Sequence, residues 1–469
     1  HQQTRQALTI ERGFPMHISP KSLLRTPEGY LFDNQSLKAL IVPLVIEQIL
    51  SIAVGAADTM MVSSAGEAAV SAVSLVDNVF VLLINLFAAL ATGGAVISGQ
   101  YLGRKRPDVA QKAAEQLILF TAIFSVLIMA LTYFFRSFIL NVVFGKIEAD
   151  VMSGCTTYLM IVAASIPFIA LYNTGAALFR AMGDSRTAMF TALIMNGINL
   201  IGNSILIFGL KMGVAGAAIP TLISRIAAAI LILSLLRNPK KIIHVSIPFP
   251  LRLDFPLLKK ILGIGIPNGL ENSMFQLGKI LVLSMVSGFG TASIAANAVS
   301  NTIGQFQILS GAAIGLAMLT VSARCVGAGS YEQVRYYTRK LLLITYCANI
   351  AVNLLVLAVL PYFIQLYSLS PEAAGYVDDI IFYHAFCVMT IWPLSFTLPN
   401  TLRAASDVKY PMLLSIVSMW VFRICFSWLL GVQFGLGVFG IWVAMTIDWL
   451  FRTICFTIRY RGHKWEHHA

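Results

Sequence analysis

The sequence predicts an all-α polytopic membrane protein with twelve transmembrane helices in two six-helix lobes, related by a pseudo-two-fold axis along the membrane normal. The 469-residue chain is 58% hydrophobic and 12% charged, with a mean hydropathy of +0.79, which is too apolar for a soluble globule of this length. Apolar runs of about 20 residues or more, the length of one bilayer crossing, recur along nearly the whole chain. The second half of the chain also repeats the first.

The predicted spans leave no room for a large soluble domain. Several exceed the minimum length for a crossing and are expected to tilt. Their bounds are 36–62, 67–97, 109–141, 151–179, 187–209, 213–236, 258–287, 291–322, 334–361, 373–402, 410–432 and 436–459.

We expect the spans to form an N-lobe and a C-lobe with polar segments between and around them. Residues 1–35 are polar and lack the apolar region of a signal peptide, so they are predicted to be a cytosolic tail. The first methionine is Met16, which leaves open whether residues 1–15 are native or a cloning or processing remnant. The other segments are the N-lobe at 36–236, a proline-rich cytosolic linker at 237–257, the C-lobe at 258–460 and a cytosolic tail at 461–469.

The net charge of +12 comes largely from Lys and Arg residues in the short connections between spans. This placement follows the positive-inside rule and argues against a nucleic-acid partner. Every second connection is basic, which predicts a multi-pass protein of the inner (plasma) membrane with both termini in the cytosol. The basic connections contain Arg104–Arg106, Arg180 and Arg186, Arg237–Arg252, Arg324–Arg339, Arg403 and Lys409, and Arg459–Lys464.

An internal repeat emerges when the chain is compared with itself at the offset that places Pro43 on Pro267. An even number of spans per repeat gives both halves the same orientation, as in transporters whose parallel lobes rock around a central cleft. The aspartates of the repeated loops RAMGD and RAASD are expected to cap or pair helix ends. Aligned pairs include Glu47 with Glu271, Gly66 with Gly290, Gly103 with Gly327, Gly213 with Gly437 and, at an offset shorter by one position, Arg180 with Arg403 and Asp184 with Asp407.

Two carboxylates interrupt the first span, in the stretch PLVIEQILSIAVGAAD that ends at Asp58. Glu47 and Asp58 are eleven residues apart, which places them within about 20° of one helix face and roughly 16 Å apart along the axis. A charge near the bilayer centre costs about 3 kcal/mol or more, so such residues usually face a cavity or a partner on an ion or proton pathway. The alternative is a protonated carboxyl group hydrogen-bonded between helices.

Four strings carry a family resemblance: GQYLGRKRPD after the second span, LFRAMGDSRTAM between the fourth and fifth, AADTMMV at the end of the first and GVAGAA at the start of the sixth. Together they resemble the multidrug and toxic compound extrusion (MATE) family, over about residues 36–460 and in both halves. The resemblance implies a cation-coupled antiporter that expels organic, often cationic or aromatic compounds, driven by inward flow of Na⁺ or H⁺.

The resemblance also implies which residues couple the cation. Asp58 matches the first-span aspartate implicated in cation coupling across the family. Asn199 and Asn203, in NGINLIGN of the fifth span, match positions where the proton-linked branch has Asn followed four residues later by Asp. We predict that Asp58 carries the coupling cation, with Glu47 and Glu271 setting the field around it and the two amides able to supply neutral oxygens. A Na⁺ ion at Asp58 is the one metal site considered.

The coupling ion stays open between Na⁺ and H⁺. The sodium-linked branch usually has a glutamate two turns after the seventh-span proline and an aspartate in the tenth span. Phe275 stands at the first of these places and Trp392 near the second, while Glu271 lies one turn earlier than expected.

Six C-lobe residues are candidates for lining a polyspecific substrate cavity, because Met and aromatic surfaces adapt to varied ligands. Packing is the more frequent role for any one of them. Lys279 follows Glu271 by two turns and could neutralise it. Three other intramembrane charges, Asp77, Arg225 and Asp448, are interpreted as helix-to-helix pairs or, for the last two, as groups that reach the membrane interface. The six candidates are Met274, Phe275, Lys279, Phe306, Trp392 and Arg423.

The sequence thus predicts a secondary antiporter for small amphipathic, cationic organic compounds, and not an enzyme. No cofactor is expected beyond the coupling ion; the expected partners are small-molecule substrates and membrane lipids, and the chain is expected to be monomeric. One alternative is a lipid-linked oligosaccharide flippase of the wider superfamily, which usually carries more arginines in its central cavity than are expected here. A more distant alternative is a membrane-embedded transferase, which needs a catalytic cluster such as HExxH and has little reason for duplicated halves.

Overall fold

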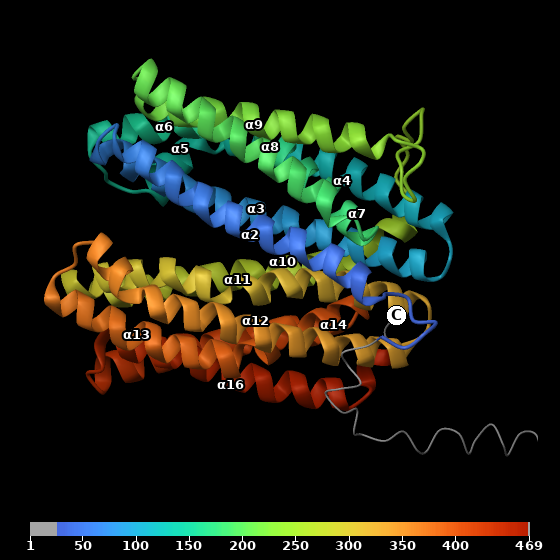
Figure 1. The fold of residues 1–469 in the computed structure, drawn as a ribbon. Coiled ribbons are helices and arrows are strands. Elements are labelled where there is room, and N and C mark those ends of the chain that lie inside the picture. Colours follow the sequence, from blue (N-terminus) through green and yellow to red (C-terminus); the bar gives the residue numbers. More distant parts are fainter. Residues whose placement is uncertain (1–25, 468–469) are drawn as a thin grey trace, which may run out of the picture.

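The computed structural model describes residues 26–467, which fold into helices and connections without a strand. The predicted tail at 1–35 therefore lies largely outside the described residues. Figure 1 shows two groups of long helices side by side, one from the first half of the chain (blue to green) and one from the second (yellow to red). This architecture confirms the predicted all-α fold of two lobes.

The first half of the chain supplies the N-lobe. Two π-helical turns, Ile139–Val143 and Ser204–Gly209, extend its helices α5 and α8. The N-lobe helices are α2 (Asn34–Ser63), α3 (Glu67–Gly103), α4 (Pro107–Phe134), α5 (Arg136–Phe138), α6 (Ala149–Ala163), α7 (Ile166–Ala181), α8 (Ser185–Asn203) and α9 (Gly213–Leu236).

The second half supplies the C-lobe. Three π-helical turns, Pro393–Thr397, Met419–Cys425 and Trp428–Gln433, lie between its later helices, and a short 3₁₀ turn, Lys464–His467, follows the last one. The C-lobe helices are α10 (Phe255–Ser287), α11 (Thr291–Gly327), α12 (Tyr331–Leu366), α13 (Pro371–Thr390), α14 (Pro399–Ala404), α15 (Lys409–Ser418) and α16 (Gly437–Arg461).

The helix bounds reproduce the internal repeat. Helices α11, α12, α15 and α16 begin at the positions that the repeat aligns with the first residues of α3, α4, α8 and α9, respectively. Helices α3 and α11 are both 37 residues long. Each follows a glycine with positive φ, Gly66 at 106° and Gly290 at 95°, a backbone region that favours glycine.

The helices account for the twelve predicted spans. Within the described residues, nine helices are long and apolar enough to cross a membrane, and two further pairs, α6 with α7 and α13 with α14, are bent by 50° and 59° at a short break. A proline, Pro167 or Pro393, follows each break. The remaining span is α10, whose 33 residues include the polar Asn268, Glu271 and Asn272 near its middle.

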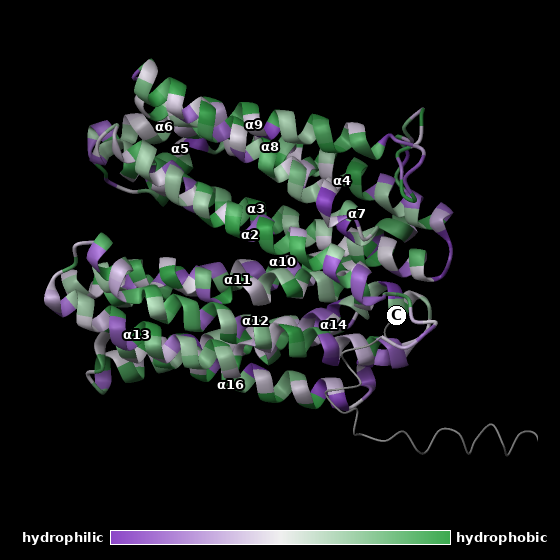
Figure 2. Cartoon of the chain, in the orientation of Figure 1, coloured by the Kyte–Doolittle hydropathy of each residue, from purple (hydrophilic) through white to green (hydrophobic). Residues whose placement is uncertain are grey.

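Polar residues gather at one end of the molecule. Figure 2 shows hydrophobic residues along the helices and hydrophilic ones concentrated in the connections next to the C-terminus. We call this the basic end and the opposite one the far end. The basic end comprises the connections 104–106, 182–184, 237–254, 328–330 and 405–408.

The lobes contact each other at the basic end, where α3 packs on α10 and α11 and α2 packs on α11. The crossing of α3 and α11 is reciprocal. A Cβ atom on Gly103 would lie 2.0 Å from the backbone oxygen of Arg324, and one on Gly327 would lie 1.9 Å from that of Gln100. Gln100 and Arg324 are themselves aligned by the repeat. Only glycine permits so close an approach of two backbones.

The side chains of the same two residues reach across the lobes in a second reciprocal contact. Gln100 Nε2 donates to the backbone oxygen of Ala404 at 2.8 Å, and Arg324 Nε donates to that of Ala181 at 3.2 Å. Ala181 and Ala404 occupy the same place in the two repeated loops. Each lobe therefore binds the other through side chains at equivalent positions of the repeat.

The end of the predicted N-terminal tail also joins the lobes. Tyr30 Oη donates to Glu332 Oε1 at 3.1 Å, and the Phe32 backbone nitrogen donates to Tyr337 Oη at 2.8 Å. The Phe32 side chain is buried. Because α2 belongs to the N-lobe and α12 to the C-lobe, this strap adds a further contact at the basic end.

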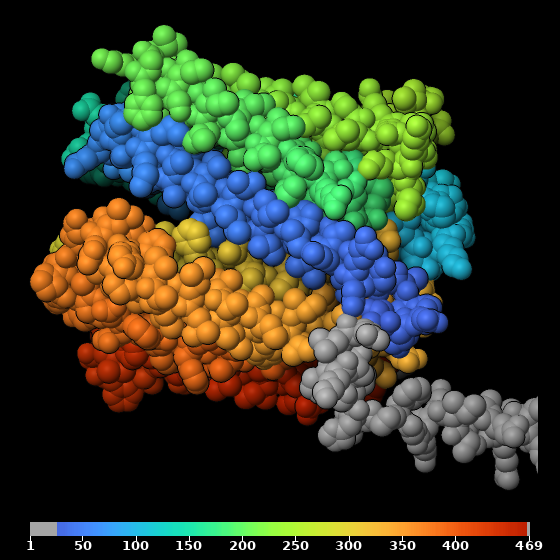
Figure 3. All heavy atoms as spheres, viewed as in Figure 1, coloured from blue at the N-terminus to red at the C-terminus, as the bar shows by residue number. Residues whose placement is uncertain are grey.

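The lobes diverge at the far end. The helices of the two halves separate toward the left of Figure 1. The space-filling view in Figure 3 has a notch at the same place, between α2 and the orange helices of the C-lobe. The molecule is therefore closed at the basic end and open at the far end.

The repeated loops of the basic end contain the expected capping aspartates. Asp184 accepts a hydrogen bond from the Thr187 backbone nitrogen at 3.2 Å and pairs with Lys241 Nζ at 2.7 Å. Partial burial works to raise the pKa of Asp184, but the hydrogen bonds from Lys241 and Thr187 outweigh it and hold that pKa below its ordinary value. Asp407 accepts two bonds from Arg459, at 2.8 and 3.2 Å.

The closed end predicts a disulfide between the lobes. A Cβ atom on Gly99 would lie 3.2 Å from Ala323 Cβ, near the separation of about 3.5–4.5 Å that disulfides require. In a background without the native cysteines, a Gly99→Cys/Ala323→Cys pair should oxidise readily. With a protease site in the 237–257 linker, the cleaved halves should stay together on a gel without reductant and separate with it.

The two single-cysteine variants serve as controls and should separate under both conditions. Cleaved double-cysteine halves that separate without reductant, after oxidation, would contradict the closed end.

Candidate functional site

Asp58 of α2 faces two amide side chains of α8. Asn203 Nδ2 donates to Asp58 Oδ1 at 2.8 Å. The Asn199 amide, oriented so that its oxygen accepts from Thr221 Oγ1 at 3.1 Å, donates to both carboxylate oxygens at 2.8 and 3.0 Å. The asparagines are one helical turn apart and so present both amides to the same face. Hydrogen bonds of this kind favour the ionised form of a carboxylate.

A cavity of about 160 Å³ borders Asp58 and is also lined by Asp77 and Tyr158. Tyr158 Oη donates to Asp77 Oδ1 at 3.0 Å. Asn203 Oδ1 is buried and has no hydrogen-bond partner among residues 26–467. Because a hard cation binds carboxylate and amide oxygens, the unpartnered oxygen and the two aspartates fit a Na⁺ ion, and either aspartate fits a proton.

Glu47 and Glu271 do not join this site. Glu47 Oε1 lies 3.5 Å from Arg180 Nη1, and Glu271 accepts two hydrogen bonds from Arg403 Nη2, at 2.8 and 2.9 Å. The repeat aligns Glu47 with Glu271 and Arg180 with Arg403, so each lobe has the same Glu–Arg pair. The expectation that Lys279 neutralises Glu271 is wrong, because Arg403 does so.

Cations gather around Phe275 in the C-lobe. The guanidinium carbons of Arg423 and Arg452 lie 5.0 and 5.8 Å from its ring centroid, and Lys279 Nζ lies 4.9 Å from it. Phe275 lines a cavity of about 320 Å³ together with Arg403 and Arg452. The sequence-based expectation of few arginines in the cavity is therefore wrong for the C-lobe. These arginines come from separate helices and turns, which hides their proximity in the sequence.

The other cavity candidates divide between packing and surface. Trp392 is buried and stacks on Phe396, with ring centroids 5.1 Å apart. Phe396 lines the cavity, so Trp392 lies behind its wall. Phe306 packs near Phe363 in the C-lobe core, with ring centroids 6.3 Å apart, and Met274 is half-buried on α10.

The sequence analysis allows Arg225 and Asp448 to reach the membrane interface, but in the structure both bond to groups inside the protein. Arg225 Nη1 donates to Ser165 Oγ at 2.8 Å inside the N-lobe. Asp448 is fully buried and accepts from Arg452 Nε at 3.0 Å. Both therefore act as contacts between or along helices.

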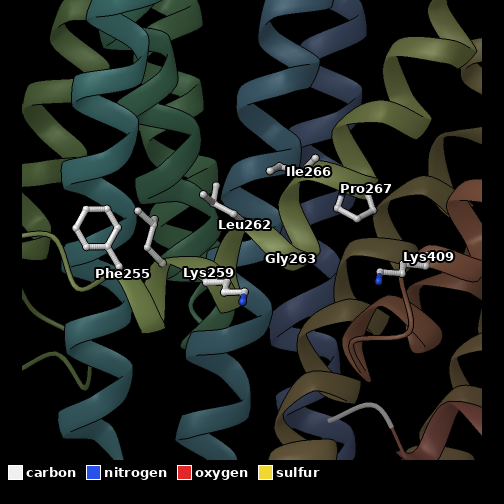
Figure 4. Close-up of a pocket in the computed structure, with 8 residues that line it drawn as sticks. Phe255, Lys259, Leu262, Gly263, Ile266, Pro267 and Lys409 are labelled. Atoms are coloured by element: carbon white, nitrogen blue, oxygen red, sulfur yellow. The ribbon is translucent and has the colours of Figure 1, made fainter.

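A groove of about 470 Å³ runs along the first turns of α10 and reaches Lys409 of α15 (Figure 4). Phe255, Leu262 and Pro267 supply much of its apolar lining, and none of its lining residues is acidic. None of the predicted site residues borders it. We therefore place the candidate site at Asp58 and at the Phe275 cavity.

Sequence reasoning missed Asp77 and Tyr158 as neighbours of Asp58. Asp77 lies on α3 and Tyr158 on α6, and no spacing in the sequence relates either of them to α2. The Glu–Arg pairs, in contrast, could have been predicted from the sequence. Because Glu47 and Arg180 are both duplicated, the repeat itself indicates that they act together.

Two duplicated six-helix lobes that enclose charged residues within the membrane define a multi-pass membrane transporter. The family model MatE matches residues 43–205 and 267–429, two segments that the internal repeat aligns with each other and that together cover more than half of the chain. The chain belongs to this family. Members of the family are transporters and not enzymes.

Relatives and solved structures agree with this assignment. The chain is 28% identical to the uncharacterized transporter YisQ of Bacillus subtilis, over 96% of this chain and 98% of the relative. It is 24% identical to the probable multidrug resistance protein NorM of Thermotoga maritima, over 93% and 94%. The fold matches a MATE structure in complex with MaL6 with a TM-score of 0.86, at 20% identity over 92% of this chain and 96% of that one. An outward-facing MATE family transporter matches with a TM-score of 0.84, at 20% identity over 91% and 95%.

The two Glu–Arg pairs predict unequal losses of stability. Removing one partner of a buried ion pair costs about 3–5 kcal/mol, because the other charge is left unpaired. Glu271→Gln should therefore lower the melting temperature of the purified protein clearly. Glu47→Gln is the matched control and should cost less, since Glu47 has one longer contact and its Oε2 has no hydrogen-bond partner in the described residues.

A Glu271→Gln/Arg403→Gln double variant should recover part of the lost stability, because it removes both charges. Equal losses for the two glutamates, or a double variant as unstable as the sum of its single changes, would count against this assignment.

Proposed function

We propose that this chain is a secondary antiporter that exports small amphipathic organic molecules in exchange for Na⁺ or H⁺, by alternating access of its two lobes. The observation that carries the proposal is Asp58, a carboxylate within the first span that faces two amides and a cavity. An intramembrane carboxylate whose charge state depends on what occupies its cavity meets the basic requirement of cation coupling.

Asp58 carries the coupling cation in this proposal. With Na⁺ bound, Asn203 Oδ1 supplies a neutral oxygen beside the carboxylate; with H⁺, the proton resides on Asp58 itself. Asp77 borders the same cavity, where Arg225 partly offsets its charge. Glu47 and Glu271 are each paired with an arginine, so each pair adds little net charge to the field around Asp58. Binding of the cation then favours one lobe arrangement and binding of the exported compound favours the other, so each drives the other across without ATP.

The basic end faces the cytosol of the cell's inner membrane in this proposal, because its connections carry the Lys and Arg residues. The far end then opens outward. The chain acts as a monomer among membrane lipids and uses no cofactor other than the coupling ion.

Multidrug efflux is favoured over oligosaccharide flipping by the relatives. Two of them are named probable multidrug resistance proteins, YoeA of Bacillus subtilis at 26% identity and NorM of Thermotoga maritima at 24%. The arginines near Phe275 remove one argument against a flippase, but they lie within one lobe and are partly neutralised by Glu271 and Asp448.

The test is gradient-driven transport of an amphipathic dye, ethidium, by protein reconstituted into liposomes under separately imposed Na⁺ and pH gradients. Asp58→Asn should abolish the gradient-driven component and leave folding nearly intact, because the asparagine keeps the shape of the side chain and removes a buried charge. The gradient that drives the unmodified protein identifies the coupling ion.

Asp108→Asn is the matched control, since Asp108 is an exposed acid at the basic end. It should transport like the unmodified protein. Full gradient-driven transport by well-folded Asp58→Asn protein would overturn the proposal and direct attention to Glu271.

A further inference from the structure

The repeat relates the N-lobe cation site to a C-lobe site of opposite charge. At the offset that places Pro43 on Pro267, Asp58 aligns with Val282 and Asn199 aligns with Arg423. The carboxylate is therefore lost in the second lobe, and one of the amides that binds it is replaced by a guanidinium. The duplicated helices have kept their positions while the charge at this place has reversed.

The first helices of the two lobes differ in the same sense. Ser51 and Gly55 of α2 align with Phe275 and Lys279 of α10. A small polar face in the N-lobe is thus replaced by an aromatic ring with an ammonium group 4.9 Å from its centroid. Compared with the N-lobe, the C-lobe therefore gains two cations, Arg423 and Lys279, and one aromatic ring, Phe275.

The C-lobe cluster has more cations than carboxylates. Glu271 pairs with Arg403 and Asp448 pairs with Arg452, so two of its four cations are neutralised directly. Lys279 and Arg423 form no ion pair within the described residues. The four cations are Arg403, Arg423, Arg452 and Lys279.

The Arg423 guanidinium is buried with hydrogen-bond donors that have no partner among the described residues. It lies in the π-helical turn Met419–Cys425 and is only 7% exposed. Its Nε and Nη1 atoms are buried, and neither finds a hydrogen-bond partner in the part of the chain that the structure describes. Asp448 is near enough to attract it electrostatically, but only Oδ1 of that carboxylate is hydrogen-bonded, to Arg452, and its buried Oδ2 bonds neither arginine within the described residues. A buried guanidinium without a hydrogen-bonded counter-ion is costly, so this geometry calls for an anion.

We propose that the C-lobe cluster binds an anionic group of the exported compound, a carboxylate on an aromatic or aliphatic body. A guanidinium binds a carboxylate through charge-assisted hydrogen bonds, and Arg423, which packs against the cavity-lining Phe275, has Nε and Nη1 free to donate. Lys279 supplies the second positive charge. Phe275 and Phe396, whose ring centroids are 6.4 Å apart, offer the apolar surface beside it. That the bound compound is exported rests on the function proposed above.

The inference narrows the substrate class. The expectation of cationic compounds rests on family resemblance, whereas this cluster selects anionic or zwitterionic amphipaths. It also separates the two ligands in space, because the coupling cation occupies the N-lobe and the anion the C-lobe. Exchange then works through the arrangement of the lobes, with no competition for a single carboxylate.

Binding of three matched probes to the purified full-length protein tests the inference. They are 1-naphthoate, its neutral analogue 1-naphthamide and the cation 1-naphthylmethylammonium. The unmodified protein should bind naphthoate most tightly. Arg423→Gln and Lys279→Gln should each weaken naphthoate binding by about tenfold or more and leave naphthamide binding nearly unchanged. Arg423→Lys, which keeps the positive charge and loses the guanidinium donors, should bind naphthoate with an affinity between those of Arg423→Gln and the unmodified protein.

Lys112→Gln, which removes the same charge from an exposed site on α4, is the matched control and should bind like the unmodified protein. Lys279 is exposed, so its variant gives a result even if Arg423→Gln fails to fold. Equal binding of the three probes, or naphthoate binding unaffected by Lys279→Gln and Arg423→Lys, would overturn the inference.

The outcome is distinguishable from failure of the proposed function. Gradient-driven ethidium transport that depends on Asp58, together with charge-independent probe binding, would leave the antiporter proposal standing and remove this one. Charge-selective naphthoate binding, with gradient-driven transport of neither ethidium nor naphthoate, would leave the C-lobe anion site standing and remove both the antiporter proposal and the claim that the bound compound is exported.

Discussion

The close contact between α3 and α11 is the constraint on which the arrangement of the lobes depends. Two glycines related by the repeat, Gly103 and Gly327, each bring their backbone against the partner helix at a distance that excludes any side chain. Gln100 and Arg324 then fasten the lobes through equivalent hydrogen bonds. Because these contacts lie at the basic end, the membrane-spanning halves of the lobes are free to separate toward the far end, which exposes the charged sites between the helices.

Duplication explains both what the lobes share and where they differ. Each lobe keeps a Glu–Arg pair near the basic end, Glu47 with Arg180 and Glu271 with Arg403, and these pairs hold helices together at little net charge. Farther along the first helix of each lobe the halves diverge. The N-lobe has Asp58 among amides, whereas the equivalent part of the C-lobe is rich in cations. A shared scaffold with two different sites suits a protein that must bind two different ligands.

Much of the fold is predictable from the sequence, because hydropathy and the repeat operate over long segments. Twelve spans and two lobes follow from them. The family follows from the resemblance of four strings, which also implies the roles of Asp58 and its two asparagines, and the structure brings these three residues together. Asp77 and Tyr158 could not be found this way, since helix rotation and packing decide which side chains of α3 and α6 reach α2. The same limit hides the cations around Phe275. Trp392 illustrates the opposite error: a ring expected to line the cavity is buried behind Phe396.

The central claim is that the charge of Asp58 sets the relative arrangement of the lobes. Pulsed electron paramagnetic resonance distances between spin labels test it directly, with one pair at the basic end, at Lys112 and Arg461, and one at the far end, at Ser64 and Ser368. Changing Na⁺ or pH should shift the two distance distributions in opposite directions, and Asp58→Asn should remove the response. Distances that do not respond, that move together, or that respond equally in Asp58→Asn protein would contradict the account.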